Sequence, residues 1–277
     1  MNNLNFLHYF TPNPILLSIG PFTIFYYGLF IVVGMMLGII LTLKLAKLHK
    51  INKELIIDLS FYLILFSIFG ARIYHILIQF SYYKHHLTEI PMIWMGGIAI
   101  HGAIFAGILV IWYFSKKHSI SFLKLSSIIV PSLALAQAIG RWGNYFNQEL
   151  FGKPTNLPWG IPISSSHLPA QYLNSAYFHP AFLYESIGNL LIFLILIYLN
   201  YLILKSKKIR LEYLTFIYIA LYSILRFFTE FFRIDITPTI AGLRFPQIIS
   251  ILLIIISSYL FYSFYKKDAI EKKEPLC

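Results

Sequence analysis

The feature that most constrains this chain is a series of long apolar segments separated by short clusters of basic residues. A helix needs about 20 mostly apolar residues to cross the hydrocarbon core of a bilayer. The segments that meet this requirement cover residues 22–43, 55–80, 92–115, 125–146, 181–204, 212–232 and 245–265. The pattern predicts an all-α polytopic membrane protein with about seven transmembrane helices, in which residues 1–277 form a single integral membrane domain.

The composition excludes an ordinary water-soluble domain. Charged residues make up 12% of the chain and hydrophobic residues 58%, whereas a soluble domain carries about 25% charged residues. In a soluble protein the formal net charge of +11 would raise the question of nucleic-acid binding. Here the lysines lie in short loops between apolar segments, as they do in membrane proteins. We therefore expect the chain to meet a lipid bilayer and no nucleic acid.

The basic residues also predict the orientation of the chain. Fifteen of them fall in alternate loops on one side: Lys44, Lys47, Lys50, Lys53, Lys116, Lys117, Lys124, Lys205, Lys207, Lys208, Arg210, Lys266, Lys267, Lys272 and Lys273. The other side holds Lys84, Lys153 and Arg233 in its loops, with Arg244 at the edge of a span. Because cytoplasmic loops are enriched in Lys and Arg, we expect the N-terminus outside and the C-terminus inside. Residues 147–180, rich in Pro, Asn and Ser, then form a small outer cap.

Three arginines, Arg72, Arg141 and Arg226, lie inside the apolar segments. An arginine at the centre of a bilayer costs roughly 2.5–3.5 kcal/mol on insertion scales, so pairing or function must compensate for each of them. The predicted topology places these and other polar residues at one depth, the outer half of the membrane: Tyr27, Arg72, His101, Arg141, Arg226 and Glu230. Unrelated structural pairs have no reason to share a depth, which favours a common site.

The spacing of the polar residues supports this clustering. One helical stripe in the sixth segment consists of Tyr222, Arg226, Glu230 and Arg233, and one in the fourth of Gln137, Arg141, Asn144 and Gln148. Residues three, four, seven or eight apart lie on the same face of a helix. Neither polar face is compatible with lipid, so the two stripes predict a shared interior.

A structural interpretation is open for each of these residues. Arg226 and Glu230 are also the spacing of a buried ion pair, and Arg141 has Glu149 and Glu185 as candidate partners. His101 in an apolar segment is also compatible with a hydrogen-bonded packing residue. The glycines of the spans, Gly34, Gly38, Gly96, Gly97 and Gly102, are more typical of helix packing than of ligand binding.

The cysteine and histidine content limits the possible chemistry. Cys277 is the only cysteine, so the chain contains no internal disulfide and no Cys-ligated metal site. No pair of histidines has the spacing of metal ligands, and the pattern gives no reason to expect a metal or another cofactor. A thiol that takes part in the chemistry must arrive with a substrate.

A resemblance to a known family begins in residues 140–152, which read Gly-Arg-Trp-Gly-Asn-Tyr-Phe-Asn-Gln-Glu-Leu-Phe-Gly. This segment resembles the signature of the prolipoprotein diacylglyceryl transferases of bacteria. Further matches follow in order along most of the chain: Tyr27-Gly28, Gly70-Ala71-Arg72, Gly97, Ile100-His101-Gly102, His179-Pro180, Leu183-Tyr184-Glu185, Tyr222 with Arg226, and Glu230 with Arg233. The family tends to place a tyrosine a few residues after the arginine at 72, where this chain has Tyr74 followed by His75, and we assign neither a role.

The resemblance implies a reaction in the bacterial plasma (inner) membrane. The diacylglyceryl group of phosphatidylglycerol is transferred to the thiol of the lipobox cysteine in a prolipoprotein signal peptide. A thioether forms and glycerol phosphate leaves. The absence of an internal cysteine fits this reaction, because the nucleophile belongs to the substrate.

The resemblance also implies roles for the polar residues. A guanidinium group holds phosphate oxygens with two parallel hydrogen bonds and stays charged in a low dielectric, so we expect Arg141 and Arg226 to bind the headgroup. Asn144 and Glu149 are expected to position its glycerol hydroxyls. The other expected substrate-binding residues are Tyr27, Gly152 and Glu230.

The thiol is mostly protonated at neutral pH and needs activation. His101 is the best candidate for the general base, since its ordinary pKa lies near neutrality. Tyr222, or a positive field that lowers the pKa of the thiol itself, are alternatives that the sequence leaves open.

Two other functions use the same residues. A lipid or solute transporter would use Arg141 and Arg226 as an anion site, but the chain lacks the internal repeat typical of many transporters. A seven-helix receptor is disfavoured by the number of intramembrane arginines.

Overall fold

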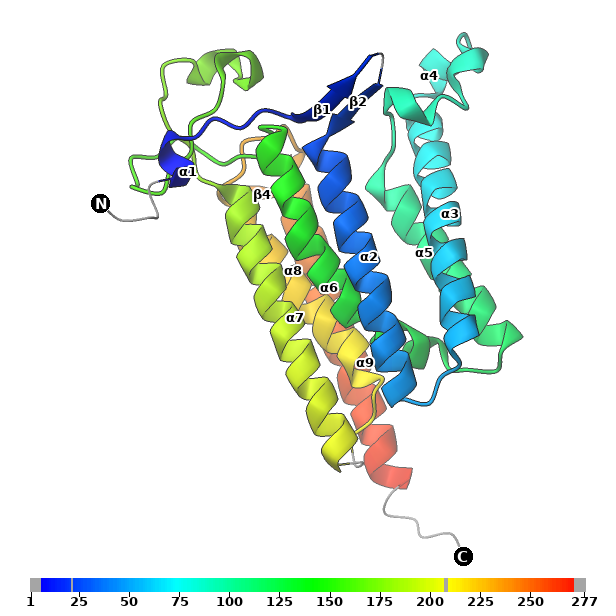
Figure 1. Cartoon of the computed structure of the whole chain (residues 1–277). Coiled ribbons are helices and arrows are strands. Elements are labelled where there is room, and N and C mark those ends of the chain that lie inside the picture. Colours follow the sequence, from blue (N-terminus) through cyan, green and yellow to red (C-terminus); the bar gives the residue numbers. More distant parts are fainter. Residues whose placement is uncertain (1–5, 21, 207–208, 272–277) are drawn as a thin grey trace, which may run out of the picture. The chain divides into compact units, whose positions relative to one another are not determined.

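The computed structural model describes residues 6–20, 22–206 and 209–271, and helices dominate this part of the chain (Figure 1). Cys277 lies outside the described residues. The long helices are α2 (Tyr26–Leu48), α3 (Lys53–Ile78), α5 (Ile100–Lys117), α6 (Phe122–Phe146), α7 (Ala181–Ser206), α8 (Tyr213–Thr229) and α9 (Phe245–Glu271). The short elements are α1 (Phe6–Tyr9), α4 (Phe80–Tyr83), the 3-10 turns η2 (Leu87–Glu89), η3 (Ile93–Met95), η4 (Ser165–His167) and η5 (Ala170–Tyr172), and the strands β1 (Ile15–Ile19), β2 (Phe22–Phe25), β3 (Thr239–Ile240) and β4 (Leu243–Arg244).

Each predicted span contains one long helix. Within the described residues, five helices are long and apolar enough to cross a bilayer, namely α2, α3, α6, α7 and α9. Helix α8 is apolar but has 17 residues, and the 18 residues of α5 end in Lys116 and Lys117. A membrane protein built of helices is thus confirmed, and the count of seven spans and their orientation stay predictions.

Two predicted spans begin too early. Residues 22–25 form β2, which pairs with β1 in an antiparallel hairpin, so the first long helix starts at Tyr26. The third predicted span begins at residue 92, but Gly96 and Gly97 have φ values of 88° and 70° and α5 starts at Ile100. Both segments have apolar side chains, and hydropathy depends on side chains alone. It therefore does not distinguish a strand or a glycine turn from a helix. The two short hairpins, β1–β2 and β3–β4, are departures from a purely helical fold.

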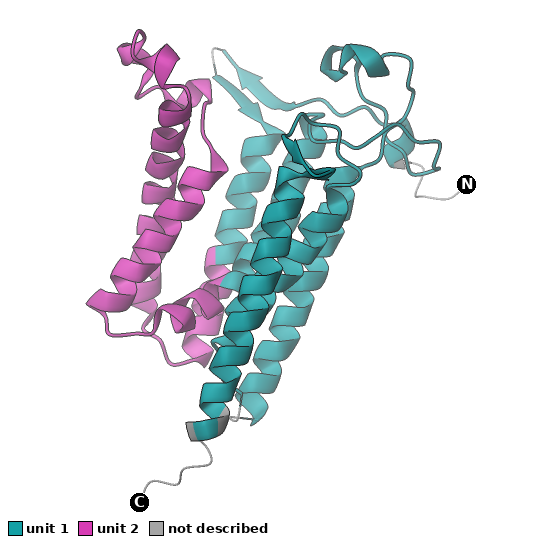
Figure 2. Ribbon diagram, turned by 180° about the vertical axis from the view of Figure 1, so that it is seen from behind, with its two compact units in different colours: residues 1–38, 130–277 teal, residues 39–129 magenta. Residues whose placement is uncertain are grey.

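The chain divides into two compact units, each of which is described by itself (Figure 2). Unit 1 contains residues 1–38 and 130–277, and unit 2 contains residues 39–129. The single integral membrane domain expected from the sequence stays a prediction.

In unit 1, helices α7, α8 and α9 pack in sequence order, and α2 approaches α6 closely at a pair of glycines (Figure 1). A Cβ atom on Gly34 would lie 3.1 Å from the carbonyl oxygen of Ala136, and one on Gly38 would lie 3.5 Å from that of Ser132. Gly34 and Gly38 therefore have the helix-packing role that the sequence indicates for them. Small residues of this kind let two helix backbones meet without a layer of side chains between them.

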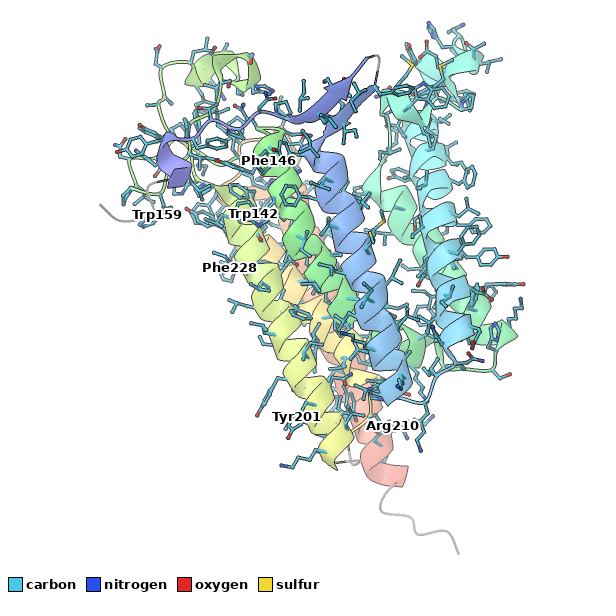
Figure 3. All side chains as sticks on the ribbon, in the orientation of Figure 1. Trp142, Phe146, Trp159, Tyr201, Arg210 and Phe228 are labelled. Atoms are coloured by element: carbon cyan, nitrogen blue, oxygen red, sulfur yellow. The ribbon has the colours of Figure 1, made fainter. Side chains whose placement is uncertain are left out.

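The predicted cap, residues 147–180, is built mainly of irregular chain around two buried residues, Ile161 and Phe178, whose backbones pair with each other. The N-terminal segment packs on it, because the His8 ring stacks on Tyr177 at 3.8 Å and its Nδ1 atom lies 2.7 Å from the carbonyl oxygen of Gly160. Trp159 lies at this end of unit 1, and Tyr201 and Arg210 lie at the opposite end (Figure 3). Aromatic side chains at two ends of a helix bundle are typical of the two membrane interfaces.

Unit 2 is organised by the packing of α3 against α5. At their closest approach Gly70 faces Gly102, and a Cβ atom on Gly102 would overlap the carbonyl oxygen of Gly70 and the Cβ atom of Tyr74. Ser67 donates a hydrogen bond of 3.3 Å to the carbonyl oxygen of Ala103 one turn further along. The first turn of α5 is therefore held against the backbone of α3.

This packing predicts that Gly102→Ala destabilises the protein, whereas Gly107→Ala on the same helix does not. A Cβ atom on Gly107 would make ordinary contacts of 3.6 Å with Ser67 Oγ and 3.7 Å with Leu63 Cδ2. Overpacking at Gly102 costs about 1–3 kcal/mol, and each replacement gains up to about 1 kcal/mol of helix propensity. Thermal unfolding in detergent should give a lower Tm for Gly102→Ala only, and equal Tm values for the two variants would contradict the backbone contact.

Candidate active site

The candidate site is organised around a buried carboxylate, that of Glu185 in the second turn of α7. Pro180 directly precedes this helix and ends the cap segment. A proline fits the start of a helix because its missing N–H is not needed there.

Three arginines from three different places in the chain bind this carboxylate. Arg141 Nη2 lies 2.6 Å from Glu185 Oε2, and Arg226 Nη1 lies 3.0 Å from Oε1. Arg233 Nη1 lies 3.2 Å from the same Oε1 atom. Glu185 therefore ties the end of α6, the end of α8 and the segment after α8 to the start of α7.

A second carboxylate, that of Glu230, is fully buried at the end of α8. Its Oε2 atom lies 2.7 Å from Arg226 Nη2, and its Oε1 atom lies 2.9 Å from Arg244 Nε. These are close ion pairs and not aligned hydrogen bonds, since neither carboxylate oxygen meets hydrogen-bond geometry. The ion pair between Arg226 and Glu230 that the sequence left open is present in the structure.

Asp235 completes the network outside the helices. Arg233 Nε donates a 2.7 Å hydrogen bond to Asp235 Oδ1, and Arg244 Nη2 lies 3.2 Å from Oδ2. Burial by itself raises the pKa of this carboxyl, but the hydrogen bond from Arg233 and the charges of Arg233 and Arg244 outweigh it and hold the pKa below its ordinary value. Arg244 also donates to the carbonyl oxygens of Arg233 and Asp235, both at 2.6 Å, which fixes the loop between α8 and β3.

The network has a surplus of positive charge. Within it, the guanidinium groups of Arg141, Arg226, Arg233 and Arg244 face the carboxylates of Glu185, Glu230 and Asp235. Among these directly paired groups, one positive charge is left that the carboxylates do not neutralise. Arg141 and Arg226 keep 21% and 20% of their side chains exposed, against 5% for Arg233. Arg244 keeps 18% exposed, so Arg233 is the only buried guanidinium group among these four and the other three are each partly accessible.

Arg141 also begins a chain of polar contacts along the end of α6. Its Nη1 atom donates a 3.3 Å hydrogen bond to Asn144 Oδ1, and Asn144 Nδ2 donates a 2.7 Å bond to Glu149 Oε1. The two bonds use both ends of the Asn144 amide and fix its orientation. Of the two partners considered for Arg141, the structure has Glu185, while Glu149 is exposed and receives the bond from Asn144.

The turn that presents Glu149 has an unusual backbone. Gln148 and Leu150 on either side of it have φ values of 51° and 56°, which residues other than glycine seldom adopt. The side chain of Gln148 stabilises this turn, because its Nε2 donates to the carbonyl oxygen of Pro12 at 2.9 Å and its Oε1 accepts from the Ser164 amide at 2.7 Å. Gln148, expected on the interior stripe with Arg141, instead joins the cap to the N-terminal segment.

Gly152 has its place for steric reasons. A Cβ atom on Gly152 would lie 2.7 Å from the Cβ atom of His179 and 2.9 Å from the carbonyl oxygen of Phe232. The backbone of Gly152 pairs with that of Arg233, which carries one of the guanidinium groups on Glu185. Gly152 thus lets the cap segment approach the arginine network closely.

Two expected tyrosines lie in the same unit. The ring of Tyr27 packs against α6, because a Cβ atom on Gly143 would lie 2.8 Å from Tyr27 Cδ2. Tyr222 stacks on Tyr218, with ring centroids 5.9 Å apart, and the Tyr218 hydroxyl donates a 2.9 Å hydrogen bond to Gln137 Oε1. The two helices that carry the predicted stripes therefore meet, through Glu185 and also through Gln137 and Tyr218, a residue of α8 outside its predicted stripe.

The two remaining residues of the predicted cluster, Arg72 and His101, belong to unit 2. His101 lies in the first turn of α5 with an exposed ring, 5.8 Å from the ring of Tyr74. Arg72 is buried and binds backbone carbonyl groups of the connector between α4 and α5. The structure thus brings Arg141, Arg226 and Glu230 together in unit 1, and a common site with Arg72 and His101 stays a prediction.

Four residues of the network, Glu185, Arg233, Asp235 and Arg244, are outside the site predicted from the sequence. The sequence predicts Arg233 on the interior stripe with Arg226 and names Glu185 as a possible partner of Arg141, but it places Arg244 only at the edge of a span and does not single out Asp235. A signal was present, since each of the four lies within a few residues of the outer end of a predicted span. Their pairing depends on contacts between helices, which hydropathy and periodicity do not describe.

Comparison with known proteins places this geometry in a family context. The family model described as prolipoprotein diacylglyceryl transferase matches residues 14–263. A phosphatidylglycerol–prolipoprotein diacylglyceryl transferase from Nostoc sp. is 44% identical over 242 residues, which cover 87% of this chain and 85% of the relative. One from Finegoldia magna is 40% identical over 257 residues, which cover 93% of this chain and 97% of the relative.

The central position of Glu185 predicts a large loss of stability for Glu185→Gln. Removing one partner of a buried ion pair costs about 3–5 kcal/mol, because the remaining charge is left without compensation, and here three arginines lose a partner. Glu149→Gln is the matched control, since Glu149 is exposed and binds the neutral amide of Asn144. Thermal unfolding in detergent should give a much lower Tm for Glu185→Gln than for Glu149→Gln. Similar Tm values would contradict the central role of Glu185 in the network.

A second prediction concerns pH. Burial, and then the charge of Lys153, lower the pKa of His179, which lies in the cap outside the helices. As the pH falls below the ordinary histidine pKa of about 6.5, the unfolded chain takes up a proton before the folded protein does. Stability present above that value is therefore lost as the pH falls through the window down to the lowered pKa. The Tm measured from pH 7.5 to 5 should decrease less in His179→Gln than in wild type, and parallel curves would exclude this contribution.

Proposed function

The chain belongs to the prolipoprotein diacylglyceryl transferase family, and on this premise we propose that it transfers the diacylglyceryl group of phosphatidylglycerol to the cysteine thiol of prolipoproteins. The substrate thiol is that of the lipobox cysteine in the signal peptide. The sulfur attacks the diacylglyceryl carbon that carries the phosphate ester, the carbon–oxygen bond breaks, and glycerol phosphate leaves as the thioether forms. The proton of the thiol passes to a base. This is the first step of bacterial lipoprotein maturation.

The single observation that carries this proposal is the pair of partly exposed arginines on one carboxylate. Arg141 and Arg226 bind Glu185 from two helices, and each keeps about a fifth of its side chain exposed. The surplus charge of the network matches the single negative charge of a phosphodiester headgroup. It also stabilises the second negative charge that develops on the departing phosphate, and charge stabilisation of this kind is a large term in catalysis.

The polar chain beyond Arg141 suits the glycerol part of the headgroup. Asn144 is fixed between Arg141 and Glu149, and the Glu149 carboxylate is exposed. We assign Asn144 and Glu149 to the glycerol hydroxyls, which both donate and accept hydrogen bonds. Tyr27, which packs on α6 at Gly143, completes this side of the site.

Gly152 and Glu230 contribute through the arginines. Gly152 lets the cap approach Arg233, and Glu230 pairs with Nη2 of Arg226 while Glu185 pairs with Nη1. Both residues therefore keep the headgroup cations in one place while substrate enters and product leaves.

His101 is assigned as the general base that takes the proton of the thiol. Its ring is exposed at the start of α5, where a peptide substrate has access. Tyr222 is the alternative, and the positive field of the arginines assists either residue by lowering the pKa of the thiol. We place the reaction at the outer face of the bacterial plasma (inner) membrane, in a chain of seven transmembrane helices with its N-terminus outside.

The proposal predicts that Arg141→Ala loses transfer of labelled diacylglyceryl from phosphatidylglycerol to a lipobox peptide. Losing one group that stabilises developing charge costs about 100- to 1000-fold in rate. The matched control is Arg210→Ala at the other end of unit 1, where Arg210 pairs with Asp268 at 2.8 Å. We expect thioether product from wild type and from the control, and almost none from Arg141→Ala.

Two outcomes would contradict the proposal. Product from Arg141→Ala at the wild-type rate would remove the arginine from the chemistry. Folded wild-type protein without thioether product would favour a transporter, with Arg141 and Arg226 as its anion site.

A further inference from the structure

We propose that Arg72 is a positioning residue for His101. Its guanidinium group binds the connector between α4 and α5 and thereby sets where the first turn of α5 lies. The inference rests on the proposed function, in which His101 takes the proton of the substrate thiol. It concerns unit 2 alone and assigns a role to the one intramembrane arginine that the headgroup network does not contain.

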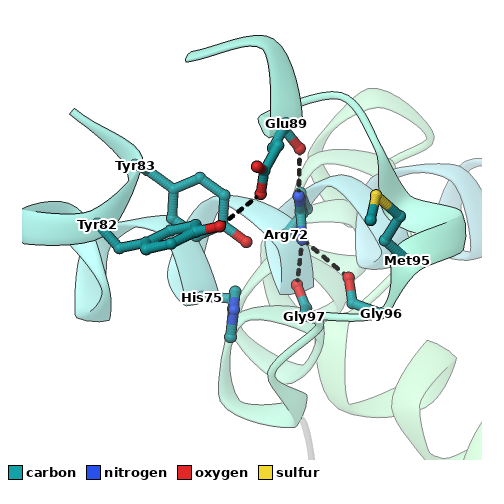
Figure 4. Close-up of a pocket in the computed structure, with 8 residues that line it drawn as sticks. All are labelled: Arg72, His75, Tyr82, Tyr83, Glu89, Met95, Gly96 and Gly97. Carbon is teal, nitrogen blue, oxygen red and sulfur yellow. Dashed lines mark hydrogen bonds between the residues drawn. The ribbon is translucent and has the colours of Figure 1, made fainter. Parts of the chain in front are cut away.

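The guanidinium group of Arg72 donates hydrogen bonds to backbone carbonyl groups (Figure 4). Its Nη2 atom donates to the carbonyl oxygen of Glu89 at 2.6 Å, and Nε donates to that of Ile90 at 2.9 Å. The Nη1 atom donates to two successive carbonyl oxygens, those of Gly96 at 2.8 Å and Gly97 at 2.9 Å. A guanidinium group has five N–H donors in a rigid plane, and four of them hold both ends of residues 89–97.

The charge of Arg72 is compensated by dipoles. Among residues 6–20, 22–206 and 209–271 no ion pair is recorded for Arg72, although its side chain is buried. The nearest carboxylate in its pocket, that of Glu89, accepts a 2.9 Å hydrogen bond from the Tyr82 hydroxyl instead. The ring of Tyr83 lies 5.1 Å from the guanidinium carbon, a cation–π contact. Leaving this cation without its carbonyl partners would be costly in the membrane, so Arg72 and the connector hold each other in place.

The two glycines are part of the same device. Gly96 and Gly97 both have positive φ values, 88° and 70°, which turn their carbonyl groups toward one nitrogen atom. A Cβ atom on Gly97 would lie 2.5 Å from Arg72 Nη1, whereas one on Gly96 would meet nothing within 4 Å. Gly97 is therefore required by space and by conformation, and Gly96 by conformation alone.

The connector leads directly into the turn that carries His101. The amide of Ala99, the N-cap of α5, donates a 3.1 Å hydrogen bond to the carbonyl oxygen of Ala71, the neighbour of Arg72. On the other side of His101, Gly102 lies against the backbone of Gly70. The backbone is thus fixed at Ala99 before His101 and at Gly102 after it. These two contacts determine where the exposed imidazole ring lies.

Arg72 acts through His101 and need not touch substrate. Displacing a catalytic group by about 1 Å can cost 100-fold in rate without weakening substrate binding. A purely structural arginine would instead change the stability of the whole protein. The test must therefore separate local release of residues 96–104 from global unfolding, and kcat from KM.

The experiment compares Arg72→Lys and Gly96→Ala with wild type and with Gly20→Ala. Lysine keeps the charge but has one nitrogen in place of the planar fork, and alanine at residue 96 disturbs one carbonyl group without a clash. Gly20→Ala is the matched control, since Gly20 has a φ of 58° and free space around it and lies in the β1–β2 hairpin. Hydrogen–deuterium exchange of residues 96–104 and of α9 is measured in detergent, together with kcat and KM for phosphatidylglycerol.

We expect about tenfold faster exchange in residues 96–104 of Arg72→Lys, with unchanged exchange in α9. We also expect kcat to fall about 100-fold while KM changes less than about twofold. Gly96→Ala should show the same pattern more weakly, and Gly20→Ala should match wild type in both measurements. If Arg72→Lys fails to fold, Gly96→Ala decides the question.

Unchanged exchange in residues 96–104, or an unchanged kcat in a variant with faster exchange there, would overturn the inference. So would exchange that rises equally in α9. A His101→Gln variant distinguishes this failure from failure of the proposed function. Wild type without transfer, or His101→Gln with normal transfer, contradicts the function or the base, whereas an inactive His101→Gln beside a fully active Arg72→Lys contradicts the positioning role.

Discussion

The structure of unit 1 depends on how charges are accommodated away from water, and the Glu185 carboxylate is the central element. A guanidinium group buried without a partner costs several kcal/mol, and in a low dielectric its attraction to a carboxylate is correspondingly strong. Arg141, Arg226 and Arg233 all meet at Glu185. This arrangement fixes the ends of α6 and α8 against the start of α7, and it brings the Gly152 segment of the cap to the same place.

The same ion pairs connect stability to activity. A set of arginines fully neutralised by carboxylates would be stable and would have little attraction for a phosphate group. A set without carboxylates would attract phosphate strongly and would destabilise the helix ends. With Glu185, Glu230 and Asp235 against four arginines, the directly paired groups keep one positive charge, which the proposed function assigns to the phosphate group. The buried charge of Arg72 is compensated differently, by the dipoles of backbone carbonyl groups. In the further inference its role is therefore to position residues and not to bind a ligand.

Much of the fold follows from local properties of the sequence. Apolar length predicted where the long helices lie, and the errors are concentrated at residues 22–25 and 92–99, where a strand and a glycine pair replace helix. Depth and helical phase selected Arg141, Arg226 and Glu230, which the structure brings together. Phase misled for Gln148, whose positive φ turns its side chain toward the cap. Periodicity assumes that a helix continues, and α6 ends before this residue.

The sequence by itself determined that this chain is a helical membrane protein of the prolipoprotein diacylglyceryl transferase family, because hydropathy and the signature at residues 140–152 are properties of contiguous residues. The tertiary structure decided which carboxylate binds which arginine, and that Arg72 binds backbone carbonyl groups. Arg141 pairs with Glu185, which is 44 residues away in the sequence, and not with Glu149, which lies on the adjoining turn. Ion pairing depends on distances of a few ångströms between side chains, and packing of the helices sets those distances.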